Sequence, residues 1–153
     1  MLELKDVSVV FNEGTVNEKV ALNNINLALD KGDFVTIIGS NGAGKSTLFQ
    51  AISGAVDTKR GNIILNGRDI TFEPEYKRSK GIGRLFQDPL KGTAPNMTIE
   101  ENLHLSNQRG KHFSLSLMSH RHREEFKKAL MELELGLEER LDSKVGLLSG
   151  GQR

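Results

Sequence analysis

Alternating hydrophobic and polar positions at the start of the chain predict two extended strands. The first covers residues 2–11 and ends at a turn signal, Asn12-Glu13-Gly14. The second covers residues 20–29 and closes at Asp30-Lys31-Gly32. Since a short loop joins them, we expect the two strands to pair antiparallel.

The next segment has a different pattern. Residues 34–38 form a short apolar run with hydrophobic side chains on both faces, which is typical of a buried strand in a parallel sheet. The run leads directly into glycine. From Lys45 the apolar residues take helical spacing up to Gly54, a residue type that commonly ends helices. We therefore predict a strand, a glycine-rich loop and a helix in succession.

Short strands followed by helices are predicted for the rest of the chain. The strands cover residues 61–67 and 82–86, and a helix begins at Thr98, with Glu101 three residues later completing a capping box. Residues 122–137 form an amphipathic helix. Its apolar stripe consists of Phe126, Leu130, Leu133 and Leu137.

Composition narrows the class of protein. The 153 residues fit about one domain. With 37% hydrophobic and 27% charged residues, the chain has enough apolar side chains for a core, and we expect it to be soluble and globular. The net charge of +1 is too small for the protein as a whole to be attracted strongly to nucleic acid or anionic lipid. The absence of cysteine excludes a disulfide scaffold or a thiolate metal site, and no signal peptide or membrane span is visible.

The strongest motif, G-x-x-x-x-G-K-[ST], lies between the predicted strand and helix. It consists of Gly39, Ser40, Asn41, Gly42, Ala43, Gly44, Lys45, Ser46 and Thr47. In such a loop the backbone N–H groups and the positive helix end bind the phosphates of a nucleoside triphosphate. Lys45 adds an ammonium, and the Ser46 hydroxyl suits Mg²⁺. The alternative is a glycine-rich turn without a ligand, which the strand and helix context disfavours.

A second glycine-rich motif ends the chain, at Leu148-Ser149-Gly150-Gly151-Gln152-Arg153. Its serine hydroxyl and backbone donors form a second anion site, with a flexible glycine end as the alternative. L-S-G-G-Q resembles the signature of ABC ATPases. Together with the phosphate loop, it makes the whole chain similar to the ATP-binding subunit of an ATP-binding cassette (ABC) transporter.

The resemblance implies an α/β fold: a P-loop NTPase core with a parallel sheet, an N-terminal antiparallel β subdomain and a helical insertion. We expect one ABC ATPase domain over 1–153, incomplete at its C-terminus. Residues 1–94 would form the β subdomain and core, 95–137 the helical subdomain and 138–153 the signature segment. The family's Walker B aspartate, catalytic glutamate and switch histidine have no counterpart here, so we expect ATP binding without turnover.

Two weaker features fall at positions that match the family. Phe11 resembles the aromatic residue that stacks on adenine; the alternative is a core residue at a strand end. Gln87 resembles the Q-loop glutamine that reaches Mg²⁺ and the attacking water; the alternative is a polar loop residue. The resemblance thus implies Lys45 and Gln87 as catalytic residues, with Ser46 and Gln87 at the metal.

The resemblance also implies partners. Two subunits would pair head to tail, with Ser149, Gly150, Gly151 and Gln152 of each covering the ATP held by the other. A permease subunit and a substrate-binding protein are further expected partners, and no nucleic acid is expected. The chain itself would be cytoplasmic, at the cytoplasmic face of the cell membrane. The chain resembles importers with separate ATPase subunits. The alternatives are a soluble ABC protein acting on ribosomes or DNA, and a P-loop kinase or GTPase, which the signature disfavours.

All four histidines lie in one stretch, residues 104–123, that contains no acidic residue. The stretch includes His104, His112, His120 and His122 with Arg109, Lys111, Arg121 and Arg123. Zinc binding is one interpretation, but the spacings fit no standard zinc pattern, so a solvated basic face is favoured. The resemblance places the helical subdomain here, which makes the face a candidate for partner contact.

Overall fold

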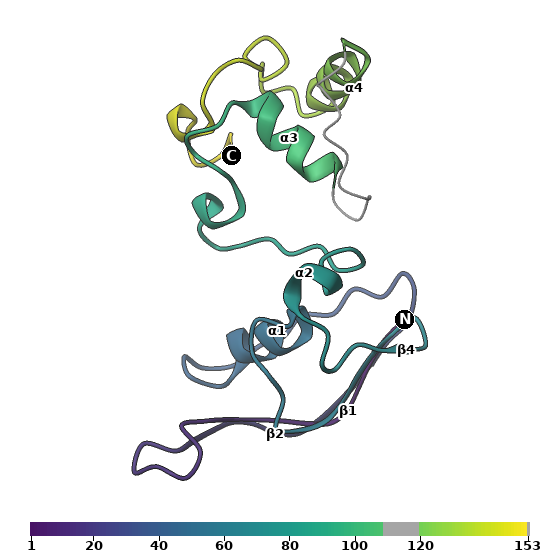
Figure 1. Cartoon of the computed structure of the whole chain (residues 1–153), viewed down its shortest axis with the longest axis vertical. Coiled ribbons are helices and arrows are strands. Elements are labelled where there is room, and N and C mark those ends of the chain that lie inside the picture. The colour runs from purple at the N-terminus through teal and green to yellow at the C-terminus, as the bar shows by residue number, and fades with distance from the viewer. Residues whose placement is uncertain (109–119, 153) are drawn as a thin grey trace. The chain divides into compact units, whose positions relative to one another are not determined.

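The chain, seen here as a computed structural model, forms two compact units, Met1–Ile82 and Gly83–Arg153 (Figure 1). The structure describes residues 1–108 and 120–152. Each unit contains its own cluster of buried apolar side chains. Within the described residues no helix has the length and apolarity needed to cross a membrane.

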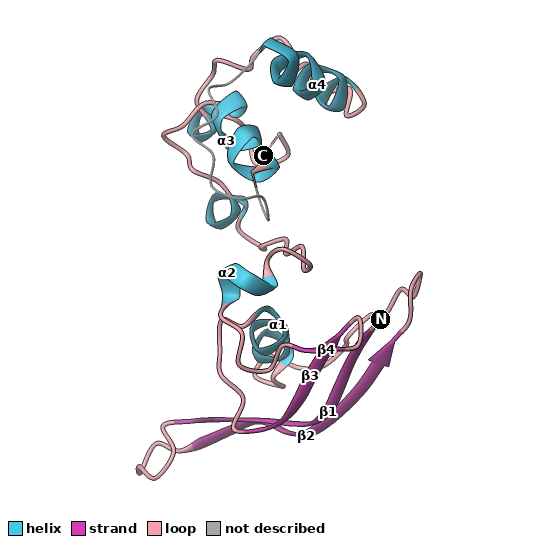
Figure 2. Cartoon of the chain, turned by 45° about the vertical axis from the view of Figure 1, so that its right-hand side comes forward, coloured by secondary structure: helices cyan, strands magenta, loops and turns pink. Residues whose placement is uncertain are grey.

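The first unit is built on an antiparallel sheet (Figure 2). Its strands are β1 (Leu2–Phe11), β2 (Lys19–Leu29), β3 (Arg60–Leu65) and β4 (Arg68–Asp69), in the spatial order β2-β1-β3-β4. Leu2 of β1 pairs with Leu29 of β2, and the pairing runs to Phe11 opposite Lys19. The predicted antiparallel pairing of the first two strands is confirmed.

The pairing of β1 with β2 shifts register at three places, and two of these bulges contain a left-handed residue. Asp6 and Asn24 both have φ of 50°, a left-handed conformation that short polar residues tolerate. The Asp6 N–H donates to Asn26 Oδ1 at 2.9 Å, and the Asn24 N–H donates to Ser8 Oγ at 2.9 Å. Side-chain oxygens therefore accept these backbone hydrogen bonds at the bulges.

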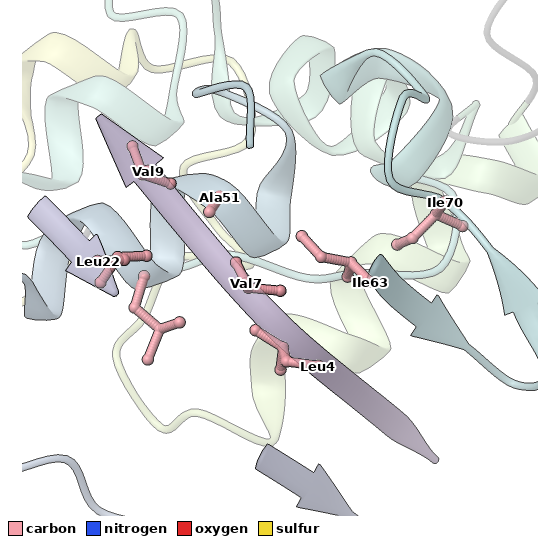
Figure 3. Packing of buried hydrophobic residues seen from close by; sticks show 8 residues of the cluster. Leu4, Val7, Val9, Leu22, Ala51, Ile63 and Ile70 are labelled. Carbon is pink, nitrogen blue, oxygen red and sulfur yellow. The ribbon is translucent and has the colours of Figure 1, made fainter. Parts of the chain in front are cut away.

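The helix α1 (Lys45–Ser53) packs on this sheet, and Figure 3 shows its Ala51 beside Val7 and Val9 of β1. The helix begins after Gly44 and ends at Gly54, which has φ of 82°, so both predicted boundaries are confirmed. The buried cluster consists of Leu4, Val7, Val9, Leu22, Leu48, Ala51, Ile63 and Ile70.

The predicted strands at 34–38 and 82–86 are not strands in the structure. Phe34 and Ile38 have exposed fractions of 94% and 90%. A strand exists only when a neighbouring strand accepts and donates its backbone hydrogen bonds, and no described strand pairs with either segment. The described sheet is therefore the antiparallel subdomain, and the parallel sheet expected around 34–38 is not formed by the described residues.

A buried arginine holds the C-terminal end of α1. Arg78, the last residue of α2 (Glu75–Arg78), is 3% exposed. Its guanidinium donates to the carbonyl oxygens of Ala51 at 2.7 Å, Ile52 at 3.0 Å, Thr71 at 2.7 Å and Glu73 at 2.7 Å. Burial lowers the pKa of the Arg78 guanidinium. The arginine thus joins the end of α1 to the segment that follows β4.

The second unit contains α3 (Ile99–Asn107), α4 (His120–Met131) and two 3₁₀ turns, η1 (Pro89–Gly92) and η2 (Val145–Leu147). The capping box predicted at the start of α3 is confirmed, with the Thr98 N–H donating to Glu101 at 2.7 Å. The core consists of Ile99, Phe126, Leu130, Leu137, Leu141, Val145 and Leu148.

The predicted helix over 122–137 ends earlier, at Met131. Glu134 has φ of 54° and Gly136 has φ of 66°, values that a right-handed helix does not accommodate. Leu133 is consequently exposed, whereas Leu137 is buried from a position outside the helix. The apolar stripe was a correct guide to Phe126, Leu130 and Leu137 but wrong for Leu133.

Candidate functional site

The phosphate loop connects residues 34–38 to α1, and its backbone depends on glycine. Gly42 and Gly44 have φ of 85° and 87°. A Cβ on Gly44 would lie 2.6 Å from the carbonyl oxygen of Ala21 in β2. The Ala43 N–H donates to the Ser40 carbonyl at 3.2 Å and closes a turn within the loop. The final glycine of the motif is therefore required both by conformation and by the neighbouring strand.

Lys45 folds its side chain back over this loop. Its Nζ donates to the carbonyl oxygens of Gly39 and Ser40, each at 2.7 Å. An ammonium has three hydrogens to donate, so one remains for an anion. The contacts localise the positive charge at the loop rather than in solvent.

The start of α1 supplies further donors. Gly44 occupies the N-cap and has no side chain to accept from the first turn, which also contains no acidic residue. The first N–H groups of an α-helix have no acceptor within the helix, so those of Lys45, Ser46 and Thr47 are open to a ligand. The donors, the charge and the exposed Ser46 hydroxyl fit a nucleotide phosphate with Mg²⁺.

The signature segment forms a closed turn in the second unit. Leu148 is buried in the core, and Ser149 follows it at the surface. The Ser149 N–H and Oγ donate to Gln152 Oε1 at 3.4 and 3.3 Å, and the Gln152 N–H donates to the Ser149 carbonyl at 3.1 Å. A Cβ on Gly150 or Gly151 would meet no atom within 4 Å. Ser149, Gly150 and Gly151 are exposed, so the tip of the turn is accessible from solvent.

Gln87 lies exposed in the segment that enters η1. Its neighbour Asp88 caps η1 by accepting from the Leu90 N–H at 3.0 Å. On its other side, the Arg84 guanidinium lies 4.5 Å from the centre of the Phe86 ring. Gln87 and the signature belong to the second unit, whereas the phosphate loop belongs to the first.

Phe11 ends β1 opposite Lys19. It is partly buried and packs against the apolar cluster of the first unit. The ring thus contacts the core, which agrees with the alternative that Phe11 is a core residue at a strand end. Its stacking on adenine stays a prediction.

Part of the histidine-rich stretch is packed rather than solvated. The rings of His104 and His122 lie 5.8 Å apart, and His122 stacks on Phe126 at 6.4 Å. The predicted basic face is wrong for Arg123, which pairs with acidic residues distant in sequence. Residues 109–119, including His112, lie outside the described residues, as do the side chains of His120 and Arg121. Among the described side chains no group of three could hold a metal ion.

Arg123 joins three parts of the second unit. It forms an ion pair with Glu100, which is 5% exposed in the first turn of α3, and it donates to the two Asp142 oxygens at 3.1 and 2.7 Å. These hydrogen bonds lower the pKa of Asp142 and raise that of Arg123. No local pattern could have revealed these pairs, because the acidic partners lie 19 and 23 residues away.

Curated relatives match the chain from end to end. The tyrosine transport ATP-binding protein of Clostridioides difficile is 40% identical over 153 residues, which are 100% of this chain and 61% of the relative. The xylose/arabinose import ATP-binding protein XylG of Sulfolobus acidocaldarius is 35% identical, over 100% of this chain and 57% of the relative. The chain thus spans about three fifths of the length of these relatives.

Solved structures have the same fold. A dimeric bacterial ABC transporter cassette matches with a TM-score of 0.79 and 27% identity, over 99% of this chain and 65% of that one. A dimeric post-hydrolysis cassette bound to ADP and Pi matches with a TM-score of 0.76 and 29% identity, over the same shares. The family model described as ABC transporter matches residues 22–153. This chain therefore belongs to the ABC transporter family, as part of its nucleotide-binding domain.

Proposed function

We propose that the intact subunit binds ATP with Mg²⁺ at residues 39–47 and hydrolyses it to drive import of a solute. One observation carries the proposal: the ammonium of Lys45 lies over the loop, 2.7 Å from both the Gly39 and the Ser40 carbonyl. With the open N–H groups of α1, this arrangement suits a triphosphate rather than a neutral ligand.

Each residue has a defined role in the proposal. Lys45 donates its remaining hydrogen to a phosphate oxygen and stabilises charge there during hydrolysis. Ser46 and Gln87 would hold Mg²⁺, which neutralises phosphate charge when bound. Gln87 also orients the attacking water, and Phe11 stacks on the adenine base.

The signature would act in a second subunit. Ser149, Gly150, Gly151 and Gln152 present an accessible tip with few side-chain atoms, which suits close approach to the phosphate held by a partner. The solved cassettes with this fold include dimers, one of them bound to ADP and Pi. We therefore assign the four residues to the nucleotide of a head-to-tail partner.

The names of the relatives support the proposed transport and its direction. Several are import proteins by name, for xylose and arabinose, phosphonates, or spermidine and putrescine. We propose an importer subunit on the cytoplasmic face of the membrane, with a permease and a substrate-binding protein as partners. A soluble ABC protein acting on ribosomes or DNA is the alternative, which copurification of a permease would disfavour.

Nucleotide titration tests the phosphate site. Lys45→Ala should weaken ATP binding at least tenfold in calorimetry, because it removes the localised charge. Lys80→Ala, a matched change at an exposed lysine, should leave ATP affinity within twofold. Equal affinity for ATP in the wild type and Lys45→Ala would refute the assignment of the loop.

A further inference from the structure

Backbone hydrogen bonds pair two segments of the second unit just before the signature. Residues 95–100 precede and enter α3, and residues 141–146 lead to Ser149. We call their paired backbone the signature ladder. Its hydrogen bonds run from Gly146 N–H to Pro95 (2.8 Å), Val145 N–H to Met97 (3.0 Å), Ile99 N–H to Ser143 (3.0 Å) and Glu100 N–H to Leu141 (3.1 Å).

Gly146 sets how closely the ladder can close. A Cβ there would lie 2.8 Å from the Pro95 carbonyl oxygen, which is closer than real Cβ atoms approach. The obstacle is backbone, so it cannot move aside as a flexible side chain would. Leu148 is buried in the core two residues after Gly146, and Ser149 comes next. Any shift of Gly146 should therefore displace the signature turn.

The Asn102 side chain holds the segment of the ladder that precedes α3. Its Oδ1 accepts from the Ala94 N–H at 2.8 Å, while its Nδ2 donates to the carbonyls of Ala94 at 3.1 Å and Thr98 at 2.9 Å. The amide thus pairs with Ala94 in both directions, as a neighbouring strand would.

The chain connects the segment held by Asn102 directly to the Q-loop segment. Ala94 follows η1, where the Thr93 hydroxyl donates to the Pro89 carbonyl at 3.2 Å and Asp88 caps the first turn. Gln87 immediately precedes that cap. The covalent chain and side chain–backbone hydrogen bonds therefore connect Gln87 through η1 and Asn102 to the ladder, which leads to Ser149.

We propose that Asn102 and Gly146 are positioning residues, which hold the signature turn at a fixed place relative to Gln87. The inference rests on the proposed function, in which both Gln87 and the signature serve bound nucleotide. Neither positioning residue needs to touch the nucleotide. They would act on the ATP of the partner subunit through Ser149. They would act on the ATP of their own subunit through Gln87.

The test uses the full-length subunit carrying Gly146→Ala or Asn102→Ala. Both variants should bind ATP with an affinity within about twofold of the wild type, because the phosphate loop lies in the first unit. Their kcat for ATP hydrolysis should fall at least tenfold. Hydrogen exchange at Ser149–Gln152 should accelerate in both variants. Asn102→Asp keeps the acceptor for the Ala94 N–H, so its kcat and its exchange rate should lie between those of Asn102→Ala and the wild type.

Leu103→Ala is the matched control, since Leu103 packs on the same core from the adjacent position of α3. It should lower the unfolding temperature without faster exchange at the signature. Two results would overturn the proposal. One is a kcat for Gly146→Ala and Asn102→Ala that is no lower than the kcat for Leu103→Ala. The other is an unchanged rate of hydrogen exchange at Ser149–Gln152 in these two variants. A wild type without ATP-dependent hydrolysis would instead contradict the proposed function, while the exchange data would still test whether the ladder positions the turn.

Discussion

Arg78 donates a hydrogen bond to the Ala51 carbonyl at 2.7 Å, at the end of α1 opposite the phosphate loop. The two ends of this helix therefore have different partners. Its N-terminal N–H groups are open to an anion, whereas its C-terminal carbonyls accept from a buried cation. Arg78 thus complements the helix dipole at the C-terminal end, and a bound anion would complement it at the N-terminal end.

Removing this arginine should destabilise the first unit. Arg78→Met leaves the buried carbonyls it serves without their donor, for which we expect a loss of roughly 3 kcal/mol in the free energy of unfolding. Urea denaturation at pH 7 measures the loss. Arg68→Met is the control, because the Arg68 side chain is 73% exposed and its pair with Glu73 should contribute less than about 1 kcal/mol. Equal losses would contradict the buried role of Arg78.

Glycine at position 44 should be irreplaceable. Gly44→Ala combines the cost of a left-handed alanine, about 1–2 kcal/mol, with a Cβ clash against the Ala21 carbonyl. Gly67→Ala has a similar φ of 78° but no atom within 4 Å, so only the conformational cost applies. We expect Gly44→Ala to lower the unfolding temperature more than Gly67→Ala does. We expect weaker ATP binding in Gly44→Ala and unchanged ATP binding in Gly67→Ala. A similar profile in both variants would show that the contact with β2 is unimportant.

The ion pairs of Arg123 predict a pH dependence of the second unit. The pKa of Asp142 is lowered in the folded chain, while an unfolded aspartate has a pKa of about 3.9. The stabilisation is therefore present above about pH 4 and is lost as the pH falls through the folded pKa. Thermal unfolding between pH 3 and 7 should show this loss in the wild type.

Arg123→Met should flatten that profile, because Asp142 then loses its partner. The exposed Arg140 offers a matched control, and Arg140→Met should keep the wild-type slope. If Arg123→Met loses stability between pH 5 and 3 as steeply as the wild type, another carboxylate determines the acid sensitivity.

Phe11 distinguishes base recognition from phosphate recognition. Phe11→Ala should weaken ATP binding by about 1–3 kcal/mol, the range for loss of a stacked base, but should spare inorganic triphosphate, which has no base. Phe11→Leu keeps apolar volume against the core while removing the aromatic face. Calorimetry with both ligands decides the role: parallel losses for ATP and triphosphate would assign Phe11 to the core.

Elements defined by local signals were predictable from the sequence. Gly54 ends α1 because only glycine adopts φ of 82° without strain, and Thr98 with Glu101 fixes the start of α3. The phosphate loop was predictable for the same reason, since its glycines and Lys45 act within one short segment. Local chemistry therefore identified the end of α1 and the start of α3, and it indicated the main candidate site.

Features that depend on distant partners were not predictable. The run at 34–38 has the composition of a buried strand, yet strand formation depends on neighbours that the segment itself does not specify. Arg78 and Arg123 look like surface residues in the sequence, but carbonyls and carboxylates from remote segments enclose them. Their roles follow from tertiary packing, which residue spacing does not encode.

The bulges of the first sheet have a consequence for association between copies of the chain. β2 lies at one end of the strand order, so its outer edge pairs with no strand in the described part of the sheet. A long regular edge would recruit the edge of another molecule. The left-handed Asn24 breaks the regular spacing of backbone donors and acceptors midway along β2, and Asn23 and Asn26 flank the break with polar side chains. Edge-to-edge aggregation is thereby opposed at β2, the longer of the two edge strands.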